Sequence, residues 1–442
     1  MAIIAQMKIF NWKMVETSSD LQRLELVLSS MLDEHLMLVL EAERKGRRDD
    51  YPIRSTWNTL IAGIVFGHES IESLRRELLR NGELRDVCGL ESAKGEKSVP
   101  KPSVYTNFLH KLFRHQELID GMFDKLVEDL HELLPDFGKR LAVDSKKLES
   151  YSVGKKEPSL SSDPEADWGS KTYKGVKRDG TFWERVKNWF GYKIHLVVDS
   201  EYELPVAFEV TKASVNDSQW LLPMVEHLKE RHLRLLEQTE YLSGDKGYDS
   251  AKNNEILWDN YGIKPVIDIR AMWSDEPELY RPISDELDNI FYDEKGKVFC
   301  RRFSKKEDVE NYCRMAFDGY EKSRNCLKYL CPSKTYGIEC TNMSECRYGR
   351  VVRVSLDKDR RIFTPVARSS YKWKNEYKHR TAIERVNSRI DMSFGFEKHY
   401  IRGLKKMRFR VGMALVVMLA MAVGRIKANQ AENMRSLVKK AA

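Results

Sequence analysis

The chain has 442 residues, of which 42% are hydrophobic and 32% are charged. This composition excludes a disordered chain, and the length exceeds one core of ordinary size, so we expect two or three domains. The formal net charge of +8 is modest, but residues 371–410 alone hold twelve Lys and Arg side chains against four acidic ones. That local basic field suits a polyanion, although a solvated basic helix face would give the same pattern.

Residues 1–138 are predicted to form an all-helical N-terminal domain. Leucines recur at helical spacing over residues 21–40, and Ser103 is a suitable N-cap for a helix that runs to about His115. Short helices joined by turns favour a helix-turn-helix that docks in a DNA groove. A helical bundle that serves only oligomerisation is the alternative.

Residues 139–270 have the pattern of an α/β domain. We expect strands at Arg140–Val143, Tyr192–Val198 and Leu204–Val210, a helix at Asn216–Leu236, a strand at Tyr241–Asp245, a helix at Ser250–Asn260 and a strand at Ile263–Ile269. This is the element order of a ribonuclease-H-like mixed sheet. Asp144 follows the first strand and Asp245 ends the fourth, where neighbouring strand ends can bring the two carboxylates together.

A polar stretch between residues 145 and 190 is predicted to be a long loop. It interleaves lysines with aromatic residues, among them Lys171, Lys187, Tyr173 and Trp183. A loop of that length inside a domain is unusual unless it is functional. It would either follow a DNA backbone and stack an exposed base, or be a connector that packs on itself.

Residues 271–350 are predicted to be a small β-rich insertion that carries a cysteine cluster. An acidic boundary at residues 275–278 precedes a hairpin at Ile290–Phe303, and six of the seven cysteines lie between residues 300 and 346. In a reducing cytosol such a cluster favours a metal over disulfides. A structural zinc site is predicted from Cys326, Cys331, Cys340 and Cys346. Unligated buried cysteines and redox chemistry are the alternatives.

Residues 351–428 are predicted to return to the α/β domain. A helix over about 370–392 would place Tyr377, Arg380 and Glu384 on one face, since they are three and four residues apart. The last helix, about 404–428, contains an apolar run of thirteen residues, Val411–Val423, which is shorter than the roughly twenty residues of a membrane span. We therefore expect a buried core helix.

Three carboxylates that converge from two strands and a helix suit a pair of hard divalent cations. Mg²⁺ and Mn²⁺ prefer oxygen ligands, and a pair of such ions can activate water or a hydroxyl against a phosphodiester. Asp144, Asp245 and Glu384 are accordingly predicted to be both the catalytic residues and the metal ligands, with Arg380 and Tyr377 binding phosphate. His195 is interpreted as a structural histidine or a phosphate contact rather than a general base.

Several segments resemble DDE transposases of bacterial insertion sequences that carry a tyrosine-arginine-glutamate signature. They are Asp144 after its strand, the connector Ser162–Trp168, the strand Gly191–His195, the acidic motif Gly244–Tyr248, and Tyr377, Arg380 and Glu384. The likeness covers most of the chain, more loosely over about 50–135. It implies DNA contacts by Tyr377, Arg380, Lys193, Lys246, Arg385 and Trp258, the last of which could instead be a core residue.

The resemblance also implies the partners. These are double-stranded DNA, as transposon ends and as target, and a second copy of the chain on paired ends. The protein is expected in the bacterial cytoplasm, associated with the nucleoid when it acts and with no membrane partner, because Met1–Phe10 lacks the features of a secretory signal. The signature lysine of the family falls here at Asp391. Two alternatives therefore stand beside an active transposase: an inactive or domesticated DNA-binding protein, and a nuclease without strand transfer.

Overall fold

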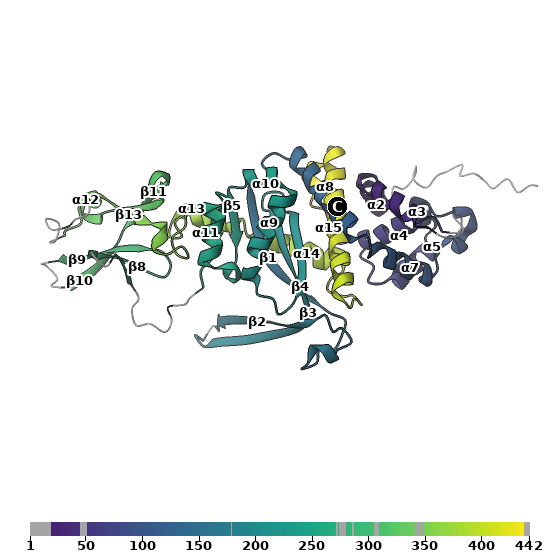
Figure 1. Cartoon of the computed structure of the whole chain (residues 1–442), viewed down its shortest axis with the longest axis horizontal. Coiled ribbons are helices and arrows are strands. Elements are labelled where there is room, and N and C mark those ends of the chain that lie inside the picture. The colour runs from purple at the N-terminus through teal and green to yellow at the C-terminus, as the bar shows by residue number, and fades with distance from the viewer. Residues whose placement is uncertain are drawn as a thin grey trace, which may run out of the picture.

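The computed structural model describes residues 19–44, 51–177, 179–270, 273, 280–284, 287–304, 309–340, 346 and 349–436. In Figure 1 the molecule is elongated: the N-terminal helices lie at one end, a mixed sheet with its helices lies in the middle, and the cysteine-bearing insertion lies at the other end. The fold is therefore mixed α/β with a helical N-terminal region, as the sequence predicts at this level.

The N-terminal region is helical throughout its described part. Its α-helices are α2 (Ser19–Ser30), α3 (Glu34–Ala42), α4 (Ile53–Val65), α5 (Ile71–Arg80), α6 (Gly82–Val87), α7 (Pro102–Leu112) and α8 (Gln116–Leu133). The leucine-rich segment 21–40 is broken into α2 and α3 near Asp33, which is buried and accepts a hydrogen bond from Trp57 Nε1 at 2.5 Å. The helix expected to be capped by Ser103 begins two residues earlier, at Pro102, and its N-cap is Lys101.

The central sheet is built around β1 (Arg140–Glu149). Antiparallel β3 (Phe182–Asp199) flanks it on one side and parallel β5 (Tyr241–Gly244) on the other, followed by parallel β6 (Lys264–Ile267). The second half of β3 also pairs with β4 (Leu204–Lys212). The strands run β4-β3-β1-β5-β6. β5 and β6 end level with Val143, but β1 continues to Glu149, so Asp144, expected to follow a strand that ends at Val143, lies within β1.

The prediction of a loop between residues 145 and 190 is wrong over most of that range. Antiparallel β2 (Asp167–Val176) and the first half of β3 form a two-stranded arm that extends from the sheet (Figure 1). Residues 182–188 are exposed, so the arm lacks the alternation of buried and exposed residues that reveals a strand.

Two predicted helices are interrupted. The segment 216–236 forms α9 (Leu221–Arg231) and α10 (Leu233–Gln238), which meet at the buried His232. The segment 370–392 forms α13 (Tyr371–Lys378) and α14 (Thr381–Phe394), separated at His379 and Arg380. α11 (Ala251–Asp259) is continuous, and α14 packs against β1 and β3.

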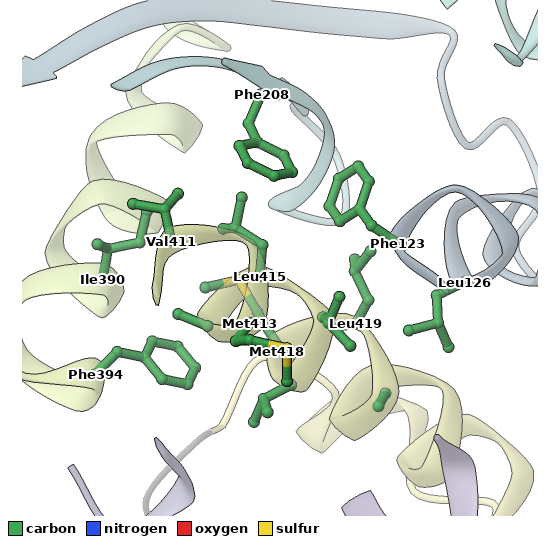
Figure 2. Close-up of a cluster of buried hydrophobic side chains, with 14 of the residues drawn as sticks. Phe123, Leu126, Phe208, Ile390, Phe394, Val411, Met413, Leu415, Met418 and Leu419 are labelled. Atoms are coloured by element: carbon green, nitrogen blue, oxygen red, sulfur yellow. The ribbon is translucent and has the colours of Figure 1, made fainter. Parts of the chain in front are cut away.

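The last helix, α15 (Leu404–Lys427), lies in the core. Figure 2 shows its side chains Leu415 and Leu419 among Phe123 of α8, Phe208 of β4 and Phe394 of α14. Among the described residues, α15 is the one helix long and apolar enough to cross a membrane by length and composition, and 83% of its most apolar window is buried inside the protein. This burial agrees with the expected core helix.

The insertion consists of two small sheets. One is ordered β10-β9-β8-β7 and the other β11-β12-β13, formed by β7 (Arg281–Ser284), β8 (Leu287–Tyr292), β9 (Val298–Ser304), β10 (Val309–Arg314), β11 (Ala316–Glu321), β12 (Cys326–Leu330) and β13 (Val351–Ser355). β8 and β9 pair as the expected hairpin. The expected acidic boundary at residues 275–278 lies outside the described residues. β13 stands where the chain was expected to return to the α/β domain, but it pairs with β12.

Candidate active site

Asp144 and Asp245 lie side by side because of strand register. Val143 of β1 is paired with Gly244 of parallel β5, and each aspartate is the next residue in its strand direction. Burial, and then the negative charge of Asp245, raise the pKa of Asp144 to about 7, while the hydrogen bond from Ser145 N to Asp144 Oδ1 (2.8 Å) opposes the rise. Two close carboxylates, one in a desolvated position, form a site that a cation would stabilise.

The sequence Asp-Lys-Gly-Tyr after β5 fixes the second carboxylate. Asp245 Oδ1 accepts a hydrogen bond from Gly247 N at 2.7 Å. A Cβ at Gly247 would lie 2.7 Å from the same oxygen, so a side chain here would displace the carboxylate. The glycine is therefore required by this close approach.

The structure adds a third aspartate that the sequence analysis missed. Asp217 accepts hydrogen bonds from Ser145 Oγ at 2.7 Å and from Lys193 Nζ at 2.9 Å. The hydroxyl of buried Tyr248 has no hydrogen-bond partner among the described atoms. Burial first, and then the charges of Asp217, Asp144 and Asp245, raise the pKa of Tyr248 well above its usual value. Asp217 lies in a short turn far along the chain from Asp144, so no local sequence pattern predicts its place beside Asp144.

Glu384 is held by its neighbour Arg380. Arg380 Nη2 donates to Glu384 Oε1 at 2.6 Å, and the Arg380 guanidinium lies 5.7 Å from the centre of the Tyr377 ring. Against the effect of burial, Tyr377, then Glu384 and then Asp144 raise the pKa of Arg380, and the charge of Arg380 acts in turn to lower the pKa of Asp144. Arg380 therefore acts on both Glu384 and Asp144. The predicted trio is brought together, although it spans the break between α13 and α14.

The residues present fit a divalent cation in part. Within the described ranges, no three His, Cys, Asp or Glu side chains gather closely enough to hold a metal ion. The paired Asp144 and Asp245 and the unsatisfied Tyr248 hydroxyl suit a hydrated hard cation. Glu384 is bound by Arg380 through Oε1, and its part in a cation shell stays a prediction.

The other predicted DNA contacts lie in different settings. Lys246 is exposed, and its Nζ lies 3.6 Å from Asp268 Oδ2. Arg385 instead forms an ion pair with Glu203 in the β3–β4 turn, with 2.6 Å between Nε and Oε1. Trp258 is half-buried against the insertion, edge-on to Tyr320. This packing favours the interpretation of Trp258 as a core residue.

Asp391, at the position of the family's signature lysine, is paired with Lys146 at 2.5 Å. Lys146 lies two residues after Asp144 on β1. In this ion pair the lysine therefore comes from β1 and the acid from α14. His195 is fully buried, its Nε2 lies 2.9 Å from Thr211 Oγ1, and burial lowers its pKa to about 4. These contacts are those of a structural histidine.

The four cysteines of the predicted zinc site are not all brought together. Cys331, Cys340 and Cys346 line one pocket, and Cys300 and Cys313 line it with them. Cys326 is buried in β12. Burial first, and then the charge of Glu321, raise the pKa of its thiol, and the charge of Arg353 opposes the rise.

A mixed sheet with one aspartate on β1, a second directly after the neighbouring parallel strand β5, and a glutamate on α14 defines an α/β protein with an acidic site. The model of the transposase DDE domain matches residues 136–420, which include all three acids. The chain therefore belongs to the transposase DDE domain family, and the predicted membership is confirmed.

Two comparisons with individual proteins are weaker. Over 80 residues the chain is 39% identical to a candidate transposase for insertion sequence element IS402 from Burkholderia cepacia, a match that takes in 17% of this chain and 37% of that relative's length. A cryo-EM structure of the piggyBac transposase synaptic complex with hairpin DNA aligns with 95% of this chain and 81% of that one, at 11% identity and a TM-score of 0.35. That score is too low to support an argument.

Proposed function

We propose that the protein is a DNA transposase that cleaves DNA at the ends of an insertion sequence and joins the freed 3′-hydroxyl to a target. The observation that carries this proposal is the adjacency of Asp144 on β1 and Asp245 directly after parallel β5, inside a transposase DDE domain. The strand order β4-β3-β1-β5-β6 supports the proposal that the sheet is ribonuclease-H-like.

Asp144, Asp245 and Glu384 are the proposed ligands of two Mg²⁺ or Mn²⁺ ions. Such ions would lower the pKa of an attacking water or hydroxyl and stabilise the leaving oxygen. If a bound cation drew Glu384 away from Arg380, the guanidinium would be free to bind the phosphate beside the scissile bond. Tyr377 supports that guanidinium through its ring.

The remaining contacts would position DNA around the acidic site. Lys193 reaches Asp217 beside Asp144, and exposed Lys246 follows Asp245, so both could bind the backbone near the carboxylates. Arg385 and Trp258 are weaker candidates, because Glu203 and Tyr320 already engage them. The N-terminal helices would read the terminal repeats, and two copies would act on paired ends in the bacterial cytoplasm.

The domain boundaries are part of the proposal. The hydrophobic cluster of the insertion takes in Ile269 before it and Phe363 after β13. We place the insertion at about 269–367 rather than 271–350, with the N-terminal helical domain at 1–138 and the two parts of the catalytic domain on either side of the insertion.

The test is a strand-transfer assay with oligonucleotide ends and Mg²⁺. Asp144→Ala, Asp245→Ala and Glu384→Ala should each abolish cleavage and keep DNA binding, while Glu226→Ala, on an exposed face of α9, should keep both. Joined product supports a transposase. Cleavage without joining would replace the proposal with a nuclease. Binding without cleavage by the unmodified chain would identify an inactive DNA-binding protein, and full activity in any of the three alanine variants would refute the assignment.

A further inference from the structure

Five cysteines line one small pocket in the insertion. Cys300, Cys313, Cys331, Cys340 and Cys346 surround a cavity of about 30 Å³, while the two other cysteines, Cys88 and Cys326, are buried elsewhere. All seven are free thiols. A pocket of this size has room for one or two water-sized particles and thus for a single ion.

Strand register and chain direction bring these cysteines together. Cys300 on β9 is directly opposite Cys313 on β10, so both side chains point to the same face of the four-stranded sheet. Cys331 comes from the other sheet, where it follows β12 and caps α12 (Pro332–Tyr336), and Cys331 N donates to Arg350 O at 2.9 Å. Cys340 and Cys346 follow that helix. The pocket therefore lies between the two sheets.

The chemistry around the pocket suits thiolate ligands. Cys300 lies opposite Cys313 across the strand pair and shares the pocket with Cys331, Cys340 and Cys346. Thiols so close together oppose each other's ionisation, and a divalent soft or borderline cation reverses that opposition. Asn289 Nδ2 donates to Cys346 Sγ at 3.8 Å, an outer contact of the kind that orients a metal ligand.

We propose that the insertion binds one structural Zn²⁺ through Cys300, Cys331, Cys340 and Cys346. Zinc takes four thiolates, and Cys313, which stands directly opposite Cys300 on the neighbouring strand, is the fifth thiol of the pocket and is left out of the shell. The thiols line the pocket without closing on its centre, since no three of the described acidic, histidine or cysteine side chains gather as closely as a metal shell requires. Rotation of the thiols into the pocket would form the shell.

The insertion has a physical need for such a link. Its two sheets share only a small hydrophobic cluster, which centres on residues such as Val298, Tyr329 and Val354. Small β-rich units are commonly stabilised by disulfides or metals, and a reducing compartment favours the metal. Four sulfur ligands with no open position describe a structural site. The zinc would therefore connect β9 to the segment after β12 and take no part in chemistry at Asp144.

The experiment measures metal in the full chain, independently of activity. Protein purified without chelators should contain one zinc per chain by mass spectrometry of the metal, and X-ray absorption should show sulfur neighbours at about 2.3 Å. Cys300→Ser and Cys331→Ser should lose the zinc. Cys326→Ser and Cys313→Ser are the matched controls and should keep it. Because a serine variant could fail to fold, Co²⁺ substitution of the unmodified protein gives a second readout, thiolate-to-cobalt charge-transfer absorption.

Three results would overturn the proposal. One is the absence of bound zinc both after purification and after reconstitution with zinc alone. A second is a metal shell of oxygen only, which would place the ion on carboxylates. A third is loss of zinc in Cys326→Ser or Cys313→Ser, or a disulfide between Cys300 and Cys313 in mass spectra of the non-reduced protein, since either would rule out this ligand set.

Discussion

At the scale of single residues, Arg380 links Glu384 to the acidic site. Arg380 binds the Glu384 carboxylate, and its charge also reaches Asp144. Without cations, the arginine therefore compensates part of the negative charge that a metal would otherwise neutralise. Glu384 keeps 53% of its side-chain surface exposed, so its ion pair with Arg380 is screened by water and can be exchanged at modest cost.

Removing this arginine should separate metal binding from catalysis. In Arg380→Met the affinity for Mn²⁺ should rise about twofold to fivefold, the equivalent of an exposed ion pair worth about 0.5–1 kcal/mol. DNA cleavage should fall, because the phosphate loses its proposed cation. Calorimetric titration with Mn²⁺ in the absence of DNA measures the first effect and the oligonucleotide assay measures the second. Unchanged or weaker Mn²⁺ binding would contradict this prediction.

The pairing of Lys146 with Asp391 makes a second prediction. Asp391→Lys restores the family's signature residue but places two cations together, so it should lower the free energy of unfolding by about 1 kcal/mol or more. Adding Lys146→Asp should recover most of that loss by reversing the pair. Urea unfolding of the two single variants and the double variant measures the coupling energy. If the losses simply add, Lys146 and Asp391 are not coupled in solution.

The buried histidine predicts a pH effect on stability. The pKa of folded His195, about 4, lies below that of an unfolded histidine, so the unfolded chain binds a proton first as the pH falls from about 6.5 to 4. Stability should fall over that range, by at most about 3 kcal/mol from this residue. His195→Gln should show a shallower fall in melting temperature between pH 7 and 5. His35→Gln, at an exposed position, is the control and should keep the original slope.

At the scale of elements, burial decided what the sequence could predict. β4, β5, β6 and the first part of β1 are buried runs and are recognisable, and the parallel pairing of β1 with β5 brings Asp144 beside Asp245. Residues 144–149 of β1 are mostly half-buried or exposed, so their pattern does not predict a strand. Most of the β2–β3 arm is exposed, so its lysines and aromatics resemble a loop. The cysteine set could not be predicted from spacing, because Cys300 meets Cys313 only through the pairing of β9 with β10.

The basic window at residues 371–410 shows the same limit. Its charge suggests a surface for DNA, yet several of its arginines are bound within the fold. Arg385 and Arg389 pair with Glu203, and Arg408 pairs with Glu209 and Asp120. Net charge along the chain does not reveal such pairs, because their acidic partners come from distant segments. The exposed lysines of the arm are therefore better candidates for backbone contacts than much of this window.

The arm should contribute to the salt dependence of DNA binding. Lys171 and Lys187 are exposed, and the positive charge of Lys171 acts to lower the pKa of Asp144, against the larger effect of burial. Lys171→Gln and Lys187→Gln should each reduce the slope of log K against log salt by about 1. Fluorescence anisotropy with end DNA at several salt concentrations measures the slope. Lys229→Gln, exposed on α9, should leave it unchanged, and an equal change in all three variants would contradict a role of the arm.

At the scale of the whole molecule, hydrophobic packing divides the chain differently from its sequence order. The N-terminal helices and the central sheet share one continuous core, because α15 packs against α2, α4, α8 and β4. The insertion has a separate hydrophobic cluster. A helical domain that looks independent in the sequence is thus tied to the sheet by the last helix, whereas the insertion, which interrupts the catalytic domain, has its own core.

This division predicts two thermal transitions. Leu419 of α15 and Leu356 after β13 are both fully buried, and Leu→Ala at such positions costs about 2–5 kcal/mol. Leu419→Ala should lower the larger calorimetric transition and leave the smaller one in place. Leu356→Ala should do the reverse, because its cavity opens in the insertion alone. Differential scanning calorimetry of both variants makes the comparison. If either substitution moved both transitions together, the two hydrophobic clusters would unfold as a single unit, and the insertion could not be treated as a separately stabilised part of the protein.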